Sequence, residues 1–399
     1  MRIRWTAILS TFRRELHFIT HDIDIIVIAL FAPIFYSLFY GTLYLNKTEH
    51  SIEIVVVDMD RSTLSRALSR NLDANQYIHV KETITDLDAA QNKINSFDAQ
   101  GVVYIPNKFE ASLKSGKGAD IKVYLNTTRF LVSNDLNKGI TAVALTMGAG
   151  VRLKYFESKG YSFKQAKEMI EPLNVEIKPM FNTTESYGDF LIPGILALII
   201  QQTLLIALAE SFAKERENNT LRNLYEHSQR SITNILFGKG MFYFVLFNAY
   251  SFLFFTAHYK LYTLPFRGNA WIVSCMTLLF VTAVLCLAIF VGTFFKRKMI
   301  AIQVLGFTSY PIFLISGYSW PAAMLPVPLR LLALAFPITP YLSAMTRVVQ
   351  MDAGFGDIVP ELFHLFVLGV LGIGLAYWRV QKIIREESNP IADVLNQKS

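Results

Sequence analysis

The sequence predicts an α-helical membrane protein with about six transmembrane helices and one inserted α/β domain outside the cytoplasm. Of the 399 residues, 52% are hydrophobic and only 17% are charged, which is more apolar surface than a soluble fold of this length needs. Several windows of about 20 residues, the length that a helix needs to cross a bilayer, carry no charge. In contrast, residues 47–189 carry 18 basic and 18 acidic residues, a composition typical of a domain in water.

The first segment, 1–24, is predicted to form an amphipathic helix in the cytoplasmic interface of the membrane. Its apolar residues recur at helical spacing, and its charged residues, Arg4, Arg13, Arg14 and Glu15, are expected to lie elsewhere on the helix. The expected apolar face consists of Trp5, Ile8, Leu9, Phe12, Leu16 and Ile19.

Six apolar windows predict the spanning helices. They cover 25–45, 190–209, 241–257, 270–295, 299–329 and 362–378. Lys239 is expected at the cytoplasmic rim, before the third helix begins, because a lysine at the centre of a spanning helix costs about 3 kcal/mol. His364 is the only ionisable residue expected clearly within a span, as a neutral, hydrogen-bonded side chain.

These windows predict the order of segments along the chain. The interfacial helix (1–24) and the first transmembrane helix (25–46) precede a periplasmic α/β domain (47–189), transmembrane helices 2–6 (190–378) and a cytoplasmic tail (379–399). Within the α/β domain, apolar runs predict strands at 52–57, 101–105 and 121–125, with a returning strand at 175–180. Helices are expected at 62–72, 87–97, 108–115, 134–159 and 162–170.

The distribution of basic residues predicts the orientation in the membrane. Of the 38 Lys and Arg residues, 16 lie in the segments 1–24, 210–240, 294–300 and 379–399, whereas only four lie in the short connections on the other side. Basic residues mark the cytoplasmic side, so both termini are expected there. The net charge of +7 is explained by this bias, and no nucleic-acid partner is expected.

The segment 317–360 is predicted to form short re-entrant helices near the outer mouth, because five prolines interrupt an otherwise apolar stretch. A simple interfacial hairpin is an equally open interpretation. The residues assigned to this outer gate are Gly317, Trp320, Pro321, Pro337 and Pro340.

Motifs of enzymes and metal sites are absent from the sequence. There is no GxxxxGK[ST] phosphate loop, HExxH, CxxC or GxSxG motif. The two cysteines, Cys275 and Cys286, have no ligand partners at metal-binding spacing and are interpreted as small packing residues. We therefore expect no catalytic residue, no metal site and no cofactor in this chain.

Two short motifs in the segment 210–240 carry a resemblance to a known family. Residues 215–221 read Glu-Arg-Glu-Asn-Asn-Thr-Leu, and residues 236–239 read Leu-Phe-Gly-Lys. The chain resembles the ABC type-2 permease family, which carries Glu-Arg-Glu-x-Gly-Thr-Leu after its second span and Leu-Gly-Lys at its third. Asn219 replaces the family glycine, and because asparagine tolerates left-handed backbone, a turn is expected there with Thr220 near a helix cap.

The resemblance implies the permease subunit of an ATP-driven exporter in the bacterial inner membrane, from the branch with a large periplasmic domain. In that family the segment 210–240 is a coupling helix that docks into a separate ATP-binding subunit, which holds ATP and Mg. The implied docking residues, expected on a solvent-facing element, are Glu215, Arg216, Glu217, Asn219, Thr220, Leu221 and Arg222.

Further partners follow from the same resemblance. They are a second permease copy or paralogue, a periplasmic adaptor and an outer-membrane channel, with an amphipathic, drug-like or lipid-like substrate. Two alternatives stay open at this point: a membrane-anchored receptor or assembly protein that lacks an ATPase partner, and an ion-coupled transporter.

Overall fold

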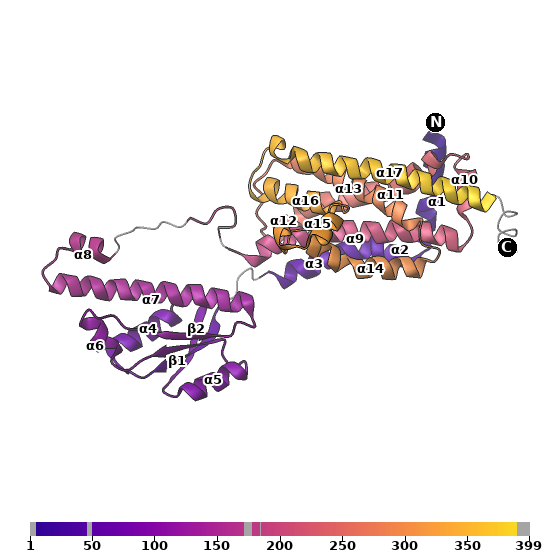
Figure 1. The fold of residues 1–399 in the computed structure, drawn as a ribbon. Coiled ribbons are helices and arrows are strands. Elements are labelled where there is room, and N and C mark those ends of the chain that lie inside the picture. Colours follow the sequence, from indigo (N-terminus) through magenta and orange to yellow (C-terminus); the bar gives the residue numbers. More distant parts are fainter. Residues whose placement is uncertain (1–4, 46–49, 171–177, 184, 389–399) are drawn as a thin grey trace. The chain divides into compact units, whose positions relative to one another are not determined.

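The computed structural model of the protein describes residues 5–45, 50–170, 178–183 and 185–388. The chain divides into two compact units, Met1–Lys47 with Pro179–Ser399, and Thr48–Lys178. In the described residues, the first unit is a bundle of helices, and the second contains all of the strands (Figure 1).

Six helices of the first unit are long and apolar enough to cross a membrane, or seven if a bent pair near the C-terminal end counts as one more span. The first consists of α2 (Ile23–Ile26), a π-helical turn (Val27–Phe31) and α3 (Ala32–Leu43). The others are α9 (Tyr187–Glu217), α11 (Ile232–Leu253) with its continuation through α12 (Tyr259–Leu261), α13 (Ala270–Gly292), α14 (Lys298–Ile315) and α17 (Val359–Ser388).

Helix α9 is the central helix of this unit. Of its most apolar stretch, 89% is buried inside the protein, against 56% or less in the other five candidate spans. It packs against α3, α11, α13 and α14, which run alongside it in Figure 1. The other long helices keep an exposed apolar side, as expected for a helix that faces lipid.

One expectation for a charged residue is wrong. The third long helix, α11, begins at Ile232, so that Lys239 lies inside it with a fully buried side chain instead of outside it. Glu210 lies inside α9, which continues beyond the predicted span at 190–209. Lys239 is tolerated because it has acidic partners inside the protein. The insertion cost used for the prediction applies to an isolated lysine without such partners.

Helix α1 (Trp5–Thr20) buries only part of the expected apolar face against the protein. Trp5 and Leu9 are 76% and 46% exposed, whereas Glu15 is fully buried. The helix packs on α11 through Ala7, Ile8, Thr11, Glu15 and Ile19. An apolar stripe therefore stays uncovered on α1, as in a helix that lies in a membrane interface.

The segment after α14 forms short helices that turn sharply. A 3₁₀ turn (Ala322–Met324) precedes α15 (Val327–Ala333) and α16 (Ile338–Met345), which continues to Gln350. The pair Val327–Ala333 and Ile338–Gln350 bends by 84°. A second 3₁₀ turn (Phe355–Ile358) leads into α17.

The second unit is built on a four-stranded sheet in the order β2-β1-β3-β4. Strand β1 (Ile52–Asp58) pairs in parallel with β2 (Ile78–Ile84) and with β3 (Gly101–Ile105), and β4 (Lys122–Leu125) is antiparallel to β3. The edge strand β2 was not expected, because polar residues alternate along it and only its first residue is buried. Of the returning strand expected at 175–180, residues 175–177 lie outside the described residues, and 178–180 are not in a strand.

Helices cover both faces of this sheet because alternate residues of a strand point to opposite sides. Ile54 and Val56 of β1 face one core, which is completed by α4 (Thr63–Asp73), α6 (Phe109–Lys114) and α7 (Phe130–Ser158). Val55 and Val57 face a second, smaller core beneath α5 (Leu87–Asn95). A further helix, α8 (Phe163–Ile170), packs on α7.

Candidate functional site

The candidate site begins where α9 ends, at a left-handed turn. Asn219 has a φ of +55°, which confirms the left-handed backbone expected there. The backbone N–H of Thr220 donates to the carbonyl of Glu215 at 2.8 Å, and that of Asn219 donates to Arg216 at 3.2 Å. These two bonds form a Schellman motif, which satisfies the last carbonyls of a helix. The chain then reverses into α10 (Leu221–His227).

Glu215 does not lie on a solvent-facing element, so that expectation is wrong for this residue. Its side chain is fully buried. Its two carboxylate oxygens accept from the guanidinium of Arg14 at 2.6 and 3.0 Å, and one of them lies 3.4 Å from the ammonium of Lys239. The Thr220 hydroxyl also donates to this carboxylate. Thr220 occupies the N-cap position of α10, but its hydroxyl holds Glu215 instead of capping that helix.

A second buried carboxylate, Glu15 of α1, completes the group. The Lys239 ammonium lies 2.5 Å from Glu15, and the Ser211 hydroxyl donates to Glu15 at 2.5 Å. We call Arg14, Glu15, Glu215 and Lys239 the charge network. Its two positive and two negative charges cancel, which is the condition under which buried ions are tolerated.

Gly238 allows α1 to approach α11 closely enough for this network to form. A Cβ atom at Gly238 would lie only 2.5 Å from Cβ of Thr11. The Thr11 hydroxyl is also within 2.9 Å of the Ser228 hydroxyl, on the turn after α10. The glycine of the second sequence motif is therefore explained by a helix contact next to Lys239.

The other two residues of the Glu-Arg-Glu motif hold the connection between α13 and α14. The Arg216 guanidinium donates to the carbonyls of Thr293 at 2.5 Å and Phe295 at 3.3 Å, just after α13 ends. A carboxylate oxygen of Glu217 accepts the backbone N–H of Lys298, the first residue of α14, at 2.8 Å. The bonds to Thr293 and Lys298 satisfy groups that a helix end leaves unpaired.

The solvent-facing part of the motif is smaller than expected. Glu217, Asn219 and Arg222 are exposed, whereas Leu221 is only 1% exposed and packs into the core of the bundle. Arg222 lies 3.6 Å from Glu226, one turn later on α10. Exposed charges of both signs therefore remain on α10 and the turn before it.

Of the residues assigned to the outer gate, Gly317 lies next to a contact with the opposite end of α9. Gly317 has a φ of +86°, a conformation that glycine adopts without strain, and it turns the chain after α14. Next to it, Tyr318 stacks on Phe190, near the start of α9, with ring centroids 5.1 Å apart. Phe190 and Glu215 are separated by about 37 Å of helix at 1.5 Å per residue, so the two groups of site residues are distinct.

Within the gate region, only part of the assigned set is exposed. Trp320 is 56% exposed, and Pro340 is buried in α16. Pro337 occupies the N-cap position of α16, where the next backbone N–H, of Ile338, donates to the Gln201 side chain of α9 at 2.9 Å. His364 lies with its Nε2 2.9 Å from the carbonyl of Leu334, which confirms the expected hydrogen bond.

More charges lie where α1 meets α2. The Lys214 ammonium bonds to Asp22, and the Lys298 ammonium lies 3.6 Å from the same carboxylate. Burial would raise the pKa of Asp22, but the two ammonium groups outweigh burial and hold the pKa below its usual value. This pairing stabilises the fold at neutral pH, and the stabilisation is lost as the pH falls through that lowered pKa.

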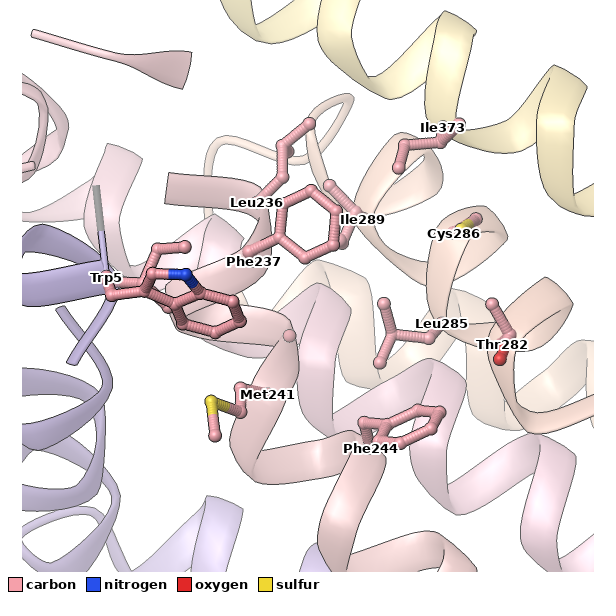
Figure 2. A pocket seen from close by; sticks show the side chains of 12 residues that line it. Trp5, Leu236, Phe237, Met241, Phe244, Thr282, Leu285, Cys286, Ile289 and Ile373 are labelled. Carbon is pink, nitrogen blue, oxygen red and sulfur yellow. The ribbon is translucent and has the colours of Figure 1, made fainter. Parts of the chain in front are cut away.

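An apolar pocket opens beside the charge network. Its volume is about 330 Å³, and its walls come from α1, α11, α13 and α17. Figure 2 shows Phe237, Met241 and Phe244 of α11 facing Leu285 and Cys286 of α13 across it, with Trp5 of α1 at one side. The volume lies at the lower end of the range for small-molecule sites, roughly 300–1,000 Å³.

Sequence reasoning missed Arg14, Glu15 and Lys239 as site residues. One signal for Glu15 was available in the sequence. Glu15 is spaced from Ile8, Thr11 and Ile19 as residues on one face of a helix are, and α1 buries that face. No signal within the sequence pairs Glu15 with Lys239, which is 224 residues away.

Comparison with known proteins supports the motif-based resemblance. The model of a family described as "ABC-2 family transporter protein" matches residues 23–378. The chain is 20% identical over 384 residues to the "Probable multidrug ABC transporter permease YbhS" of Escherichia coli K12, covering 95% of this chain and 98% of that protein. It is 23% identical over 351 residues to the "Inner membrane transport permease YhhJ" of the same organism, covering 83% and 85%.

Proposed function

Because this chain belongs to the ABC-2 transporter family, a family of transporter membrane subunits that implies an ATP-binding partner, we propose that it is the permease of an ATP-driven exporter. It moves an amphipathic, drug-like or lipid-like substrate out of the cytoplasm or the inner membrane. Two permeases, identical or paralogous, assemble with two ATP-binding subunits, and the substrate crosses between the permeases.

One observation carries this proposal: a single motif at the end of α9 contacts four other helices of the bundle. Glu215 reaches α1 and α11 through Arg14 and Lys239, Arg216 reaches the end of α13, and Glu217 reaches the start of α14. A force applied at the exposed turn after α9 therefore acts on four helices at once. Discrete packed contacts of this kind transmit motion because they shift as units.

The docking surface in this proposal consists of Glu217, Asn219, Arg222 and Glu226. Charges of both signs give an interface its register and its choice of partner. The buried Glu215 anchors this surface instead of touching the ATP-binding subunit.

The proposed topology places both termini, the turn after α9 and the start of α14 in the cytoplasm, where the basic residues concentrate. The unit Thr48–Lys178 then lies in the periplasm, as in the branch of the family that carries a large domain there. We propose that this unit meets a periplasmic adaptor, which leads to an outer-membrane channel.

Transport into inverted vesicles tests the function. Vesicles that hold the chain and the ATP-binding subunit with which it co-purifies should accumulate a fluorescent amphipathic dye when ATP is added, and a protonophore should not reduce the uptake. Uptake that collapses with the proton gradient would indicate an ion-coupled transporter. A chain that recruits no ATP-binding subunit and moves no dye would instead be a receptor or assembly protein.

The apolar pocket supports the substrate class and makes a separate prediction. Thr282→Phe places a ring in the pocket, so we expect it to reduce dye uptake at least fivefold while leaving co-purification of the ATP-binding subunit unchanged. Thr256→Phe is the matched control, because Thr256 is exposed and is not among the residues that line the pocket. Equal uptake by the two variants would remove the pocket from the transport path.

A further inference from the structure

Three carboxylates meet where α2 passes α9, and one of them, Asp22, also takes part in the lysine contacts described above. Asp22 and Asp24 lie at the start of α2, and Glu210 lies on α9 one turn before Lys214. One oxygen from each carboxylate lies within 4.8 Å of an oxygen from each of the others. Acidic side chains this close repel one another unless nearby positive charge compensates them or one of them holds a proton.

Glu210 is the unusual member of this group. Its side chain is fully buried. Neither of its carboxylate oxygens has a hydrogen-bond partner within the described residues 5–45, 50–170, 178–183 and 185–388. A buried carboxylate is normally paired or bound to a metal, because the loss of water is otherwise uncompensated.

The two neighbouring lysines, Lys214 and Lys298, balance only two of the three negative charges. The Lys214 ammonium bonds to Asp22, and the Lys298 ammonium lies 2.6 Å from Asp24 and 3.6 Å from Asp22. Asp22 also accepts the backbone N–H of Asp24 at 3.1 Å. Three carboxylates face two ammonium groups, and the carboxylate without a bond is Glu210.

We propose that Asp22, Asp24 and Glu210 bind a hard divalent cation such as Mg²⁺ or Ca²⁺, in competition with the ammonium of Lys298. Carboxylate oxygens are the ligands that these ions prefer. Oxygens within 4.8 Å of one another fit around a single ion that binds them at about 2.3–2.6 Å, the range for Ca²⁺. The sequence offered no metal-binding spacing here, because Glu210 lies far along the chain from the two aspartates.

Charge balance identifies Lys298 as the competitor. Its side chain is 26% exposed, whereas that of Asp22 is 2% exposed, so the ammonium can swing into solvent while the carboxylates stay in place. With Lys298 displaced, three carboxylates, the Lys214 ammonium and one divalent ion sum to zero. The exchange would loosen the start of α14, where Glu217 holds the backbone of the same lysine.

Manganese titration of the full chain in lipid nanodiscs, without ATP, tests this site. Mn²⁺ favours the same oxygen ligands, and its free concentration is read by electron paramagnetic resonance. We expect one Mn²⁺ per chain, binding at least tenfold weaker in Glu210→Gln, and binding severalfold tighter in Lys298→Met. Glu168→Gln, which removes an exposed carboxylate of the other unit, should bind as the wild type does.

Three outcomes would overturn the cation site. The first is unchanged Mn²⁺ binding in Glu210→Gln, and the second is a lack of Mn²⁺ binding in both the wild type and Lys298→Met. The third is an unfolding midpoint that depends on pH without Mn²⁺ in the wild type but not in Glu210→Gln, which would assign a proton to Glu210. If Glu210→Gln does not fold, Asp24→Asn tests the same ligand set from the partly exposed end of the site and should also weaken binding. None of these readouts depends on transport.

Discussion

Lys239→Met is expected to destabilise the folded protein by about 3–5 kcal/mol, the usual cost of removing one partner from a buried ion pair. The lysine is fully buried and lies between Glu15 and Glu215. Without it, two buried carboxylates face the single guanidinium of Arg14. Thermal unfolding of the purified chain in detergent, followed by fluorescence, should show a midpoint lowered by roughly 10 °C.

Two further variants show whether charge imbalance causes this loss. Glu15→Gln combined with Lys239→Met removes one charge of each sign, so it should recover part of the lost stability. Lys81→Met removes an exposed lysine that pairs with Glu53 and Asp98, and the midpoint should change little because exposed pairs contribute little. A single Lys239→Met variant that unfolds at the wild-type temperature would show that the charge network does not hold α1 against α9 and α11.

Charge reversal at Glu217 is expected to weaken binding of the ATP-binding subunit at least tenfold, which corresponds to about 1.4 kcal/mol. The side chain is exposed on the proposed docking surface, and a reversed charge there faces the complementary charge of the partner. Titration of the labelled ATP-binding subunit against the permease in nanodiscs measures the change.

Glu217 also accepts the first backbone N–H of α14, so Glu217→Lys alone cannot separate docking from local structure. Glu217→Gln keeps an oxygen that accepts this bond and removes only the charge. We expect it to leave the unfolding midpoint unchanged and still weaken docking, and Arg222→Glu, on the exposed side of α10, to do the same. Normal affinity in all three variants would show that this turn does not contact the ATP-binding subunit.

The sequence predicted features that depend on one continuous stretch of chain. Hydropathy found the long apolar helices because the interior of a bilayer selects continuous apolar segments. The left-handed turn at Asn219 was predictable because asparagine tolerates that backbone, whatever surrounds it. The motif of residues 215–221 pointed to the family that the comparison over residues 23–378 then supported.

Other local patterns were misleading. The edge strand β2 has the sequence Ile-His-Val-Lys-Glu-Thr-Ile, and its alternating polar residues hid it from a search for buried apolar runs. On α1, the predicted apolar face is divided between two environments, because Ile8 and Ile19 are buried in the protein whereas Trp5 is 76% exposed. A membrane protein has two apolar environments, its own core and the lipid, and hydrophobicity alone does not separate them.

By itself, then, the sequence determined which segments form long apolar helices, where the chain reverses after α9, and the family to which the chain belongs. Only the tertiary structure decided that the four residues of the charge network neutralise one another, and that Glu210 has no hydrogen-bond partner among the described residues. The reason is physical. The free energy of a buried charge depends on the groups that helix packing brings within a few ångströms, and those groups come from segments about 200 residues apart in the chain.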